Sequence, residues 1–193
     1  MEYALEELEW DNVWWESTGN TEAKRVLYIG DSISCALRRL ATEASGMKIL
    51  FDGYGSSKAL DNPYLTPAIQ MFGRQEGRRE LVLVNNGLHG FHLDDETEYP
   101  AGYEKLIGFL EEEYAGTPLA VVLTTSAGGG NNDRVIRRNA HAREIAEKHG
   151  LPVIDLYTPS REISRLHTDE YHFCEEGNRI LAKKLLEEAE KLI

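Results

Sequence analysis

The segment Val26–Ser34 is the feature that most constrains the fold of this chain. Residues 26–29 form a continuous apolar run, which is typical of a strand that is covered on both faces of a parallel sheet. From Ile33 onward, apolar residues recur at helical spacing, at Leu37, Leu40, Ala41 and Ala44. The segment therefore predicts a buried strand that ends at Gly30-Asp31-Ser32 and passes directly into a helix.

This junction places Ser32 where a strand ends and a helix begins. In open α/β sheets, ligands bind at the carboxyl edge of the strands. Free backbone N–H groups and the positive end of the helix gather there, and both can stabilise an oxyanion. A second interpretation remains open, in which Ser32 is only the N-cap of its helix, because serine is common at that position.

The rest of the chain repeats the same alternation of strand and helix. Four more strands are expected after the first, over residues 47–51, 81–84, 120–123 and 152–156, and helices are expected over 64–73, 97–114, 133–148 and 175–192. Such alternation predicts a three-layer α/β/α sandwich with a five-stranded parallel sheet and right-handed crossovers. The segment 52–57 contains two glycines and is expected to be a loop.

The length of 193 residues is that of one α/β domain, so residues 1–193 are expected to form a single domain. Residues 1–23 are an acidic lead-in that contains Trp10, Trp14 and Trp15. Aromatic residues at this density predict a segment that is pinned across the body of the domain. A platform on which sugar rings stack is the alternative interpretation of these tryptophans.

The net charge of −12 disfavours several classes of partner. A nucleic-acid groove needs a basic stripe, and docking on anionic membranes needs basic residues as well. The first residues show no signal-peptide pattern, and no apolar run reaches the length of a membrane span. The two cysteines, Cys35 and Cys174, are therefore interpreted as reduced thiols, and a cytoplasmic location is expected.

A second polar cluster, His167-Thr168-Asp169-Glu170-Tyr171-His172, precedes the last predicted helix. Asp169 and His172 are three residues apart, so on a turn the carboxylate can hold the imidazole Nδ1–H. The imidazole Nε2 is then free to take a proton from a serine hydroxyl. An isolated Asp-x-x-His is usually a surface turn. Because Ser32 stands at the same edge of the predicted sheet, the pair instead favours a Ser-His-Asp arrangement.

These two blocks resemble those of the SGNH (GDSL-like) hydrolases. Gly30–Ser34 is similar to the first block of that family, which carries the nucleophile, and Asp169–His172 is similar to its last block, which carries the acid and the base. The resemblance covers the chain beyond about residue 20. It implies a flavodoxin-like sheet and the roles of nucleophile for Ser32, base for His172 and orienting acid for Asp169.

The two middle blocks of the family are less regular here. The family's second block supplies a glycine N–H to the oxyanion hole, and Gly53 or Gly55 is expected to fill that role, with the turn Gly55–Ser57 preferred. Its third block is usually Gly-x-Asn-Asp, whereas this chain has Asn85-Asn86-Gly87-Leu88-His89, which is similar to a variant branch of the superfamily. The oxyanion hole is thus expected to comprise the Ser32 N–H, Gly55 and Asn85.

Several neighbouring residues have two interpretations. Asn86 is the second choice for the side-chain donor, and the asparagine pair is also typical of a simple turn. Asn86, His89 and Asp31 are expected to contact the substrate. His89 and His92 could share a metal ion, but no further metal-binding pattern accompanies them, and no metal site is predicted. The glycines at 128–130 predict a mobile loop at the same sheet edge.

The resulting hypothesis is a serine esterase that forms an acyl-enzyme and needs no cofactor. The loops around the predicted site are polar, which favours a short acyl group on a small-molecule or carbohydrate substrate, such as an O-acetylated sugar. A lysophospholipase or thioesterase of the same fold is the first alternative. The second is a non-catalytic binding module, which the atypical block at Asn85–His89 suggests. The oligomeric state is left open.

Overall fold

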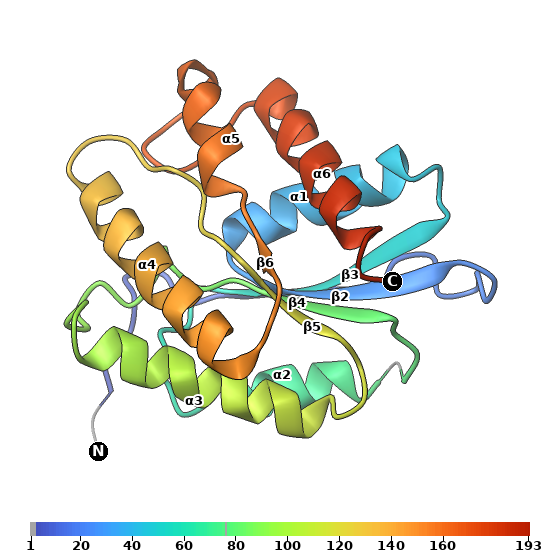
Figure 1. The fold of residues 1–193 in the computed structure, drawn as a ribbon, viewed down its shortest axis with the longest axis horizontal. Coiled ribbons are helices and arrows are strands. Elements are labelled where there is room, and N and C mark those ends of the chain that lie inside the picture. Colours follow the sequence, from blue (N-terminus) through green and yellow to red (C-terminus); the bar gives the residue numbers. More distant parts are fainter. Residues whose placement is uncertain (1–2, 76) are drawn as a thin grey trace.

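A computed structural model describes residues 3–75 and 77–193, which form one twisted sheet covered by helices on both faces (Figure 1). The strand order is β1-β3-β2-β4-β5-β6. The strands span β1 Asp11–Trp14, β2 Lys24–Gly30, β3 Ile49–Ser56, β4 Leu81–Val84, β5 Leu119–Val122 and β6 Val153–Ile154.

The predicted α/β class is confirmed, with one correction to the sheet. Five strands are parallel as expected, but a sixth strand, β1, pairs antiparallel with β3 at the edge. Its four residues are all exposed, so they lack the apolar pattern by which a strand is recognised in a sequence. The segment 52–57 is also not a loop, because β3 continues through it as far as Ser56.

Helices lie on both faces of the sheet (Figure 1). One face carries α1, α5 and α6, and the other carries α2, α3 and α4. The helices span α1 Ser32–Ala44, α2 Leu65–Gly73, α3 Glu98–Glu113, α4 Asn131–His149, α5 Tyr157–Glu162 and α6 Glu175–Ala189, and a 3₁₀ turn, η1, spans Ser164–Leu166. Within the described residues, no helix combines the length and the apolar character that crossing a membrane requires.

The apolar run of β2 is divided between two cores. Val26 and Tyr28 pack with α1 and α6, whereas Leu27 and Ile29 pack with α2 and α3. All four side chains are buried, because alternate residues of a strand point to opposite faces of the sheet. A continuous apolar run is therefore what a central parallel strand requires.

The position of β2 decides where a site can form. The chain leaves β2 toward β3 on one side and later returns to place β4 on the other. At such a switch point the connections diverge, and a crevice opens beyond the carboxyl ends of the strands. Asp31 and Ser32 follow the end of β2 directly, so they lie at this switch point.

Candidate active site

The residue that caps the N-terminus of α1 is Asp31, and not Ser32. Asp31 is the N-cap of α1, with extended backbone and a carboxylate Oδ1 that accepts from the Ile33 N–H at 2.9 Å. The interpretation of Ser32 as a mere N-cap is therefore wrong. Ser32 occupies the first helical position, where a backbone N–H has no partner within the helix.

Two facing glycines allow α1 to begin close against the sheet. Gly30 and Gly55 are partners in the parallel register of β2 and β3. A Cβ on Gly55 would lie 2.2 Å from Cys35 Sγ, and one on Gly30 would lie 2.8 Å from Ser34 Cβ. The turn predicted at Gly55 is thus wrong: this glycine lies inside a strand that is paired on both sides, and its small size serves the packing of α1.

Three of the predicted side chains form one chain of hydrogen bonds. Ser32 Oγ lies 2.8 Å from His172 Nε2, and His172 Nδ1 lies 2.8 Å from Asp169 Oδ2. An ionised carboxylate only accepts, so Nδ1 carries the proton that it donates to Asp169. Nε2 is then left to accept from the Ser32 hydroxyl. Residues 140 positions apart in the sequence are thereby joined above the carboxyl end of β2.

The turn that carries the histidine is organised by Asp169. Its Oδ1 accepts from the backbone N–H groups of His172 and Tyr171, both at 2.8 Å. These two bonds, followed by the bond from the His172 ring, lower the pKa of Asp169 to about 2. The carboxylate therefore stays ionised at neutral pH and keeps the imidazole in one orientation.

A neighbouring loop holds this turn in place. The Gly128 N–H donates to the Glu170 carbonyl at 2.6 Å. Asn131, the first residue of α4, donates from Nδ2 to Glu170 Oε1 at 2.9 Å and to the Tyr171 hydroxyl at 2.7 Å. The glycine-rich loop at 128–130 thus contacts the turn that carries the base. Sequence reasoning gave Asn131 no role, because one asparagine at a helix start carries no signal of a distant partner.

The two asparagines after β4 point to different surroundings. Asn85 is buried, and its Nδ2 donates to the Val122 carbonyl at 3.0 Å and to Thr124 Oγ1 at 2.9 Å. Both of its N–H bonds thus tie β4 to the end of β5, and the structure gives no support to Asn85 as an oxyanion donor. Asn86 is half-buried, and its backbone carbonyl accepts from the Tyr99 hydroxyl.

Asp31 and His89 bring two buried polar atoms to the base of the site. Asp31 Oδ2 and His89 Nε2 have no hydrogen-bond partner within the described part of the chain. Burial raises the pKa of the Asp31 carboxyl, and the nearby imidazoles of His89 and His172 act in the opposite direction. His89 therefore lies close to the residue that precedes the nucleophile.

The N-terminal segment crosses the same region. Trp10 is tied to the end of β3 by two bonds, from its N–H to Ser57 Oγ at 2.8 Å and from the Ser57 N–H to its carbonyl at 3.1 Å. The Trp10 ring meets the His89 imidazole edge-on, with centroids 5.9 Å apart. His92 instead pairs with Asp61 at 3.0 Å, so the two histidines have separate neighbours.

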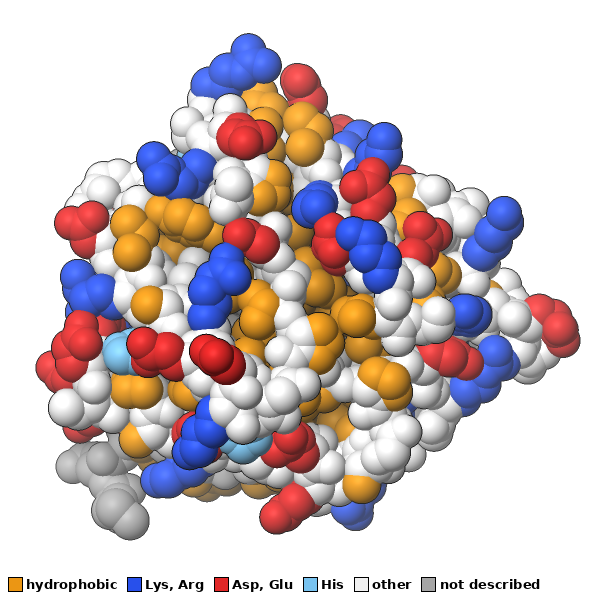
Figure 2. All heavy atoms as spheres, in the orientation of Figure 1, with side chains coloured by type: hydrophobic (Ala, Val, Ile, Leu, Met, Phe, Trp, Pro, Cys, Tyr) orange, Lys and Arg blue, Asp and Glu red, His pale blue; other side chains and the backbone are white. Residues whose placement is uncertain are grey.

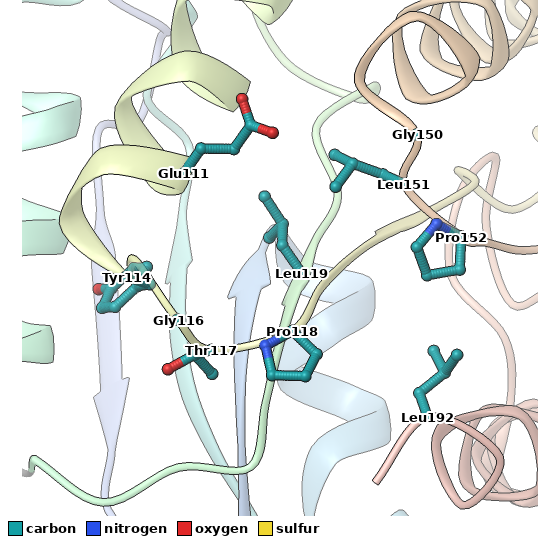
Figure 3. A pocket seen from close by; sticks show the side chains of 10 residues that line it. All are labelled: Glu111, Tyr114, Gly116, Thr117, Pro118, Leu119, Gly150, Leu151, Pro152 and Leu192. Carbon is teal, nitrogen blue, oxygen red and sulfur yellow. The ribbon is translucent and has the colours of Figure 1, made fainter.

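A hollow at the other end of the sheet lies far from these groups. It is lined by Leu119 at the start of β5, by Leu151 and Pro152 just before β6, and by Tyr114 after α3 (Figure 3). This is the amino edge of the parallel strands, opposite the edge that carries Ser32. Glu111, the acidic residue at its rim, is paired with His149 at 2.8 Å. The hollow offers no nucleophile and base in contact.

Comparison with known proteins identifies the fold. No family model matches the chain, and no curated protein matches it in sequence. Solved structures, however, do match, and three of them illustrate the likeness. An acetyl xylan esterase is 18% identical, covers 85% of this chain and 98% of its own, and gives a TM-score of 0.68. A member of the lipolytic protein G-D-S-L family from Veillonella parvula is 21% identical, with 86% and 97% covered and a TM-score of 0.69. A carbohydrate acetylesterase from Sinorhizobium meliloti is 15% identical, with 88% and 100% covered and a TM-score of 0.65.

This chain shares their fold. At these identities the likeness is one of architecture, and it agrees with the sandwich of helices around a parallel sheet described above. One of the three, a member of the lipolytic protein G-D-S-L family, is of the type that the two sequence blocks resemble. The variant block at Asn85–His89 stays a prediction.

Proposed function

We propose that this chain is a serine esterase that hydrolyses short-chain acyl esters, with O-acetylated carbohydrates as the preferred substrates. The observation that carries this proposal is the pair of 2.8 Å contacts that joins Ser32 Oγ to His172 Nε2 and His172 Nδ1 to Asp169 Oδ2. Such an arrangement turns a weak hydroxyl nucleophile into a strong one, because a base removes its proton as it attacks.

The first half of the reaction forms an acyl-enzyme. Ser32 Oγ attacks the ester carbonyl carbon while its proton passes to His172 Nε2, and the carbonyl oxygen becomes an oxyanion. When the tetrahedral intermediate collapses, the bond to the leaving alkoxide breaks, and the alkoxide takes the proton from Nε2. The ionised Asp169 stabilises the imidazolium that exists between these two transfers.

The second half releases the acyl group. A water molecule attacks the acyl carbon, gives its proton to His172, and the returning proton restores the Ser32 hydroxyl as the carboxylic acid leaves. The Ser32 N–H at the start of α1 is the proposed first oxyanion donor, because the helix N-terminus favours negative charge. Asn86 and His89 are the proposed side-chain contacts to the substrate, and neither half needs a metal or an organic cofactor.

The substrate class follows from the surroundings of the site. The Trp10 and His89 rings are in contact, His89 lies close to Asp31, and a polar and aromatic lining suits a sugar better than a long acyl chain. Two of the proteins that share the fold are an acetyl xylan esterase and a carbohydrate acetylesterase. Both observations favour an acetyl group on a carbohydrate over the lysophospholipase or thioesterase alternative.

The proposal is tested by replacing the nucleophile. Ser32→Ala should lower the rate of p-nitrophenyl acetate hydrolysis by at least about a thousandfold. A fluorophosphonate probe should label the native chain at Ser32. Ser164→Ala is the matched control, since Ser164 is exposed and contributes its backbone carbonyl to His167. Full activity in Ser32→Ala would overturn the proposal.

The same assay separates the substrate classes. Native enzyme should hydrolyse acetyl esters faster than octanoyl esters and should release acetate from acetylated xylo-oligosaccharides. A rate that rises with acyl length would favour the lysophospholipase or thioesterase. Absence of both labelling and hydrolysis would favour a binding module.

A further inference from the structure

Arg138 is a fully buried arginine in α4 that belongs to none of the groups placed in the reaction. Its side chain is 0% exposed. Its Nε donates to Asp95 Oδ1 at 2.9 Å, and its two terminal nitrogens donate to backbone carbonyls of the loop after β4: to Gly87 at 3.3 Å, His89 at 2.6 Å and Gly90 at 2.8 Å. A buried charge is costly unless its donors are satisfied, so an arginine in this place needs a reason.

The guanidinium is held in one plane by its neighbours. Its central carbon lies 4.3 Å from the centroid of the Tyr99 ring and 5.3 Å from that of Phe91. Asp95, its carboxylate partner, also forms ion pairs with Arg134 and Arg137, at 2.9 and 3.0 Å. Figure 2 shows Lys and Arg side chains mixed with Asp and Glu across one face of the molecule, whereas Arg138 is enclosed. The planar guanidinium therefore holds the carbonyls of the loop backbone in a fixed geometry.

The loop that Arg138 holds, residues 87–90, carries His89. The Arg138 fork bonds residue 89 itself and the residue on its C-terminal side. The imidazole lies close to Asp31, meets the Trp10 ring edge-on, and buries a ring nitrogen, Nε2, that has no partner among the described residues. Its other ring nitrogen, Nδ1, lies 3.7 Å from Glu6 Oε1. A buried ring nitrogen without a partner beside the nucleophile turn is placed to bond a polar group of the substrate, as donor or acceptor according to the tautomer.

We propose that Arg138 is a positioning residue: it fixes the backbone of residues 87–90 so that His89 presents Nε2 to the substrate. This inference rests on the proposed esterase function. Lysine cannot replace the arginine, because an ammonium has no planar fork that spans three carbonyls and a carboxylate. The residue acts through His89 and does not touch the reacting atoms.

Arg138→Lys tests the proposal, with Arg137→Lys as the matched control. Arg137 binds the same Asp95 carboxylate, is half-exposed, and donates to no carbonyl of residues 87–90. Rates are expressed per active site titrated with fluorophosphonate, so an unfolded fraction does not count. Arg138→Lys should lower kcat by up to about a hundredfold, the effect of a displaced catalytic contact, while the control stays within about twofold.

A double-mutant cycle separates positioning from mere structural support. In a His89→Ala background, Arg138→Lys should lower kcat by no more than about twofold, because its effect passes through the imidazole. The proposal is overturned if the double variant loses kcat by the product of the two single effects. It is also overturned if Arg138→Lys keeps the native kcat. Should Arg138→Lys fail to fold, Asp95→Asn loosens the same fork and must show the same dependence on His89. Full activity in Ser32→Ala would instead overturn the esterase function, and this inference with it.

Discussion

The two turns that meet at the site are built in opposite ways. The nucleophile turn, residues 30–35, joins the end of β2 to the first turn of α1, which packs against the sheet, and the side chain of its acid, Asp31, is buried. The base turn, residues 167–173, lies at the surface, where the Asp169 and His172 side chains are 56% and 43% exposed. One turn is fixed by close packing, whereas the other is fixed by hydrogen bonds to its own backbone and to the loop at 128–131.

The site therefore combines a nucleophile on a packed turn with a base on an exposed turn that hydrogen bonds hold in place. Burial raises the pKa of Asp31, and backbone N–H groups lower that of Asp169 to about 2. A change in the buried turn should therefore disturb the fold before the chemistry. A change in the exposed turn should disturb the chemistry and leave the fold intact.

The largest expected effect is on activity, at the exposed turn. His172→Ala removes the base, so kcat/KM should fall by at least about a thousandfold. The midpoint of thermal unfolding should move by no more than a degree or two, because the side chain is half-exposed and packs against no core. His141→Ala is the control and should retain native activity, because this α4 imidazole pairs with Glu96 and Glu144 and contacts none of the three reacting side chains. A large fall in stability without the loss of rate would contradict the contrast between a packed nucleophile turn and an exposed base turn.

The buried turn should show the reverse. Gly55→Ala places a methyl group 2.2 Å from Cys35 Sγ, so the free energy of unfolding should fall by about 1–3 kcal/mol. Gly108→Ala, in α3, meets nothing within 4 Å and should leave stability unchanged or raise it by about 0.5–1 kcal/mol. Urea unfolding measures both.

A second substitution checks the cause of that loss. Adding Cys35→Ala to Gly55→Ala removes the sulfur that the new methyl group meets, so the double variant should regain most of the lost stability. If the double variant remained as unstable as Gly55→Ala, close packing beneath α1 would not be what fixes the nucleophile turn.

The parts of the site that depend on residues close together in the sequence can be predicted from the sequence. The strand-to-helix junction at Ser32 follows from apolar periodicity, and the pair Asp169 and His172 follows from their spacing on a turn. The structure brings all three side chains together. Their meeting could be expected because both turns lie at one edge of a parallel sheet.

The remaining parts depend on partners that are distant in the sequence. The sequence favours Asn85 as a donor to the oxyanion, but both of its N–H groups bond Val122 and Thr124, at the end of β5 and just beyond it. Gly55 looked like a turn residue because an exposed edge strand, β1, gave no sign that β3 extends so far. Arg138 has no sequence signal, since arginine in an amphipathic helix is normally expected at the surface.

The smallest expected effects are on the pH dependence of stability, which should be opposite for Asp169 and Asp31. The pKa of Asp169 in the folded chain is about 2, below its ordinary value of 3.8. Between these values the unfolded chain binds more protons, so this carboxylate stabilises the fold above about pH 4 and stops doing so as the pH falls through 2. Asp169→Asn should therefore lose stability at pH 5, by no more than about 1 kcal/mol because the group is exposed, and the loss should fade toward pH 2.

Asp31 should behave in the opposite sense. Its pKa is raised by burial, so above pH 3.8 the folded chain binds more protons than the unfolded one, and the ionised form costs stability as the pH rises. Asp31→Asn keeps an oxygen for the Ile33 N–H and removes the charge, so its stability relative to the native chain should increase from pH 4 to pH 7. Denaturant unfolding of Asp169→Asn from pH 2 to pH 5, and of Asp31→Asn from pH 4 to pH 7, gives the two slopes. Slopes of the same sign would mean that Asp31 is solvated or paired like Asp169, and the contrast between a packed nucleophile turn and an exposed base turn would fail.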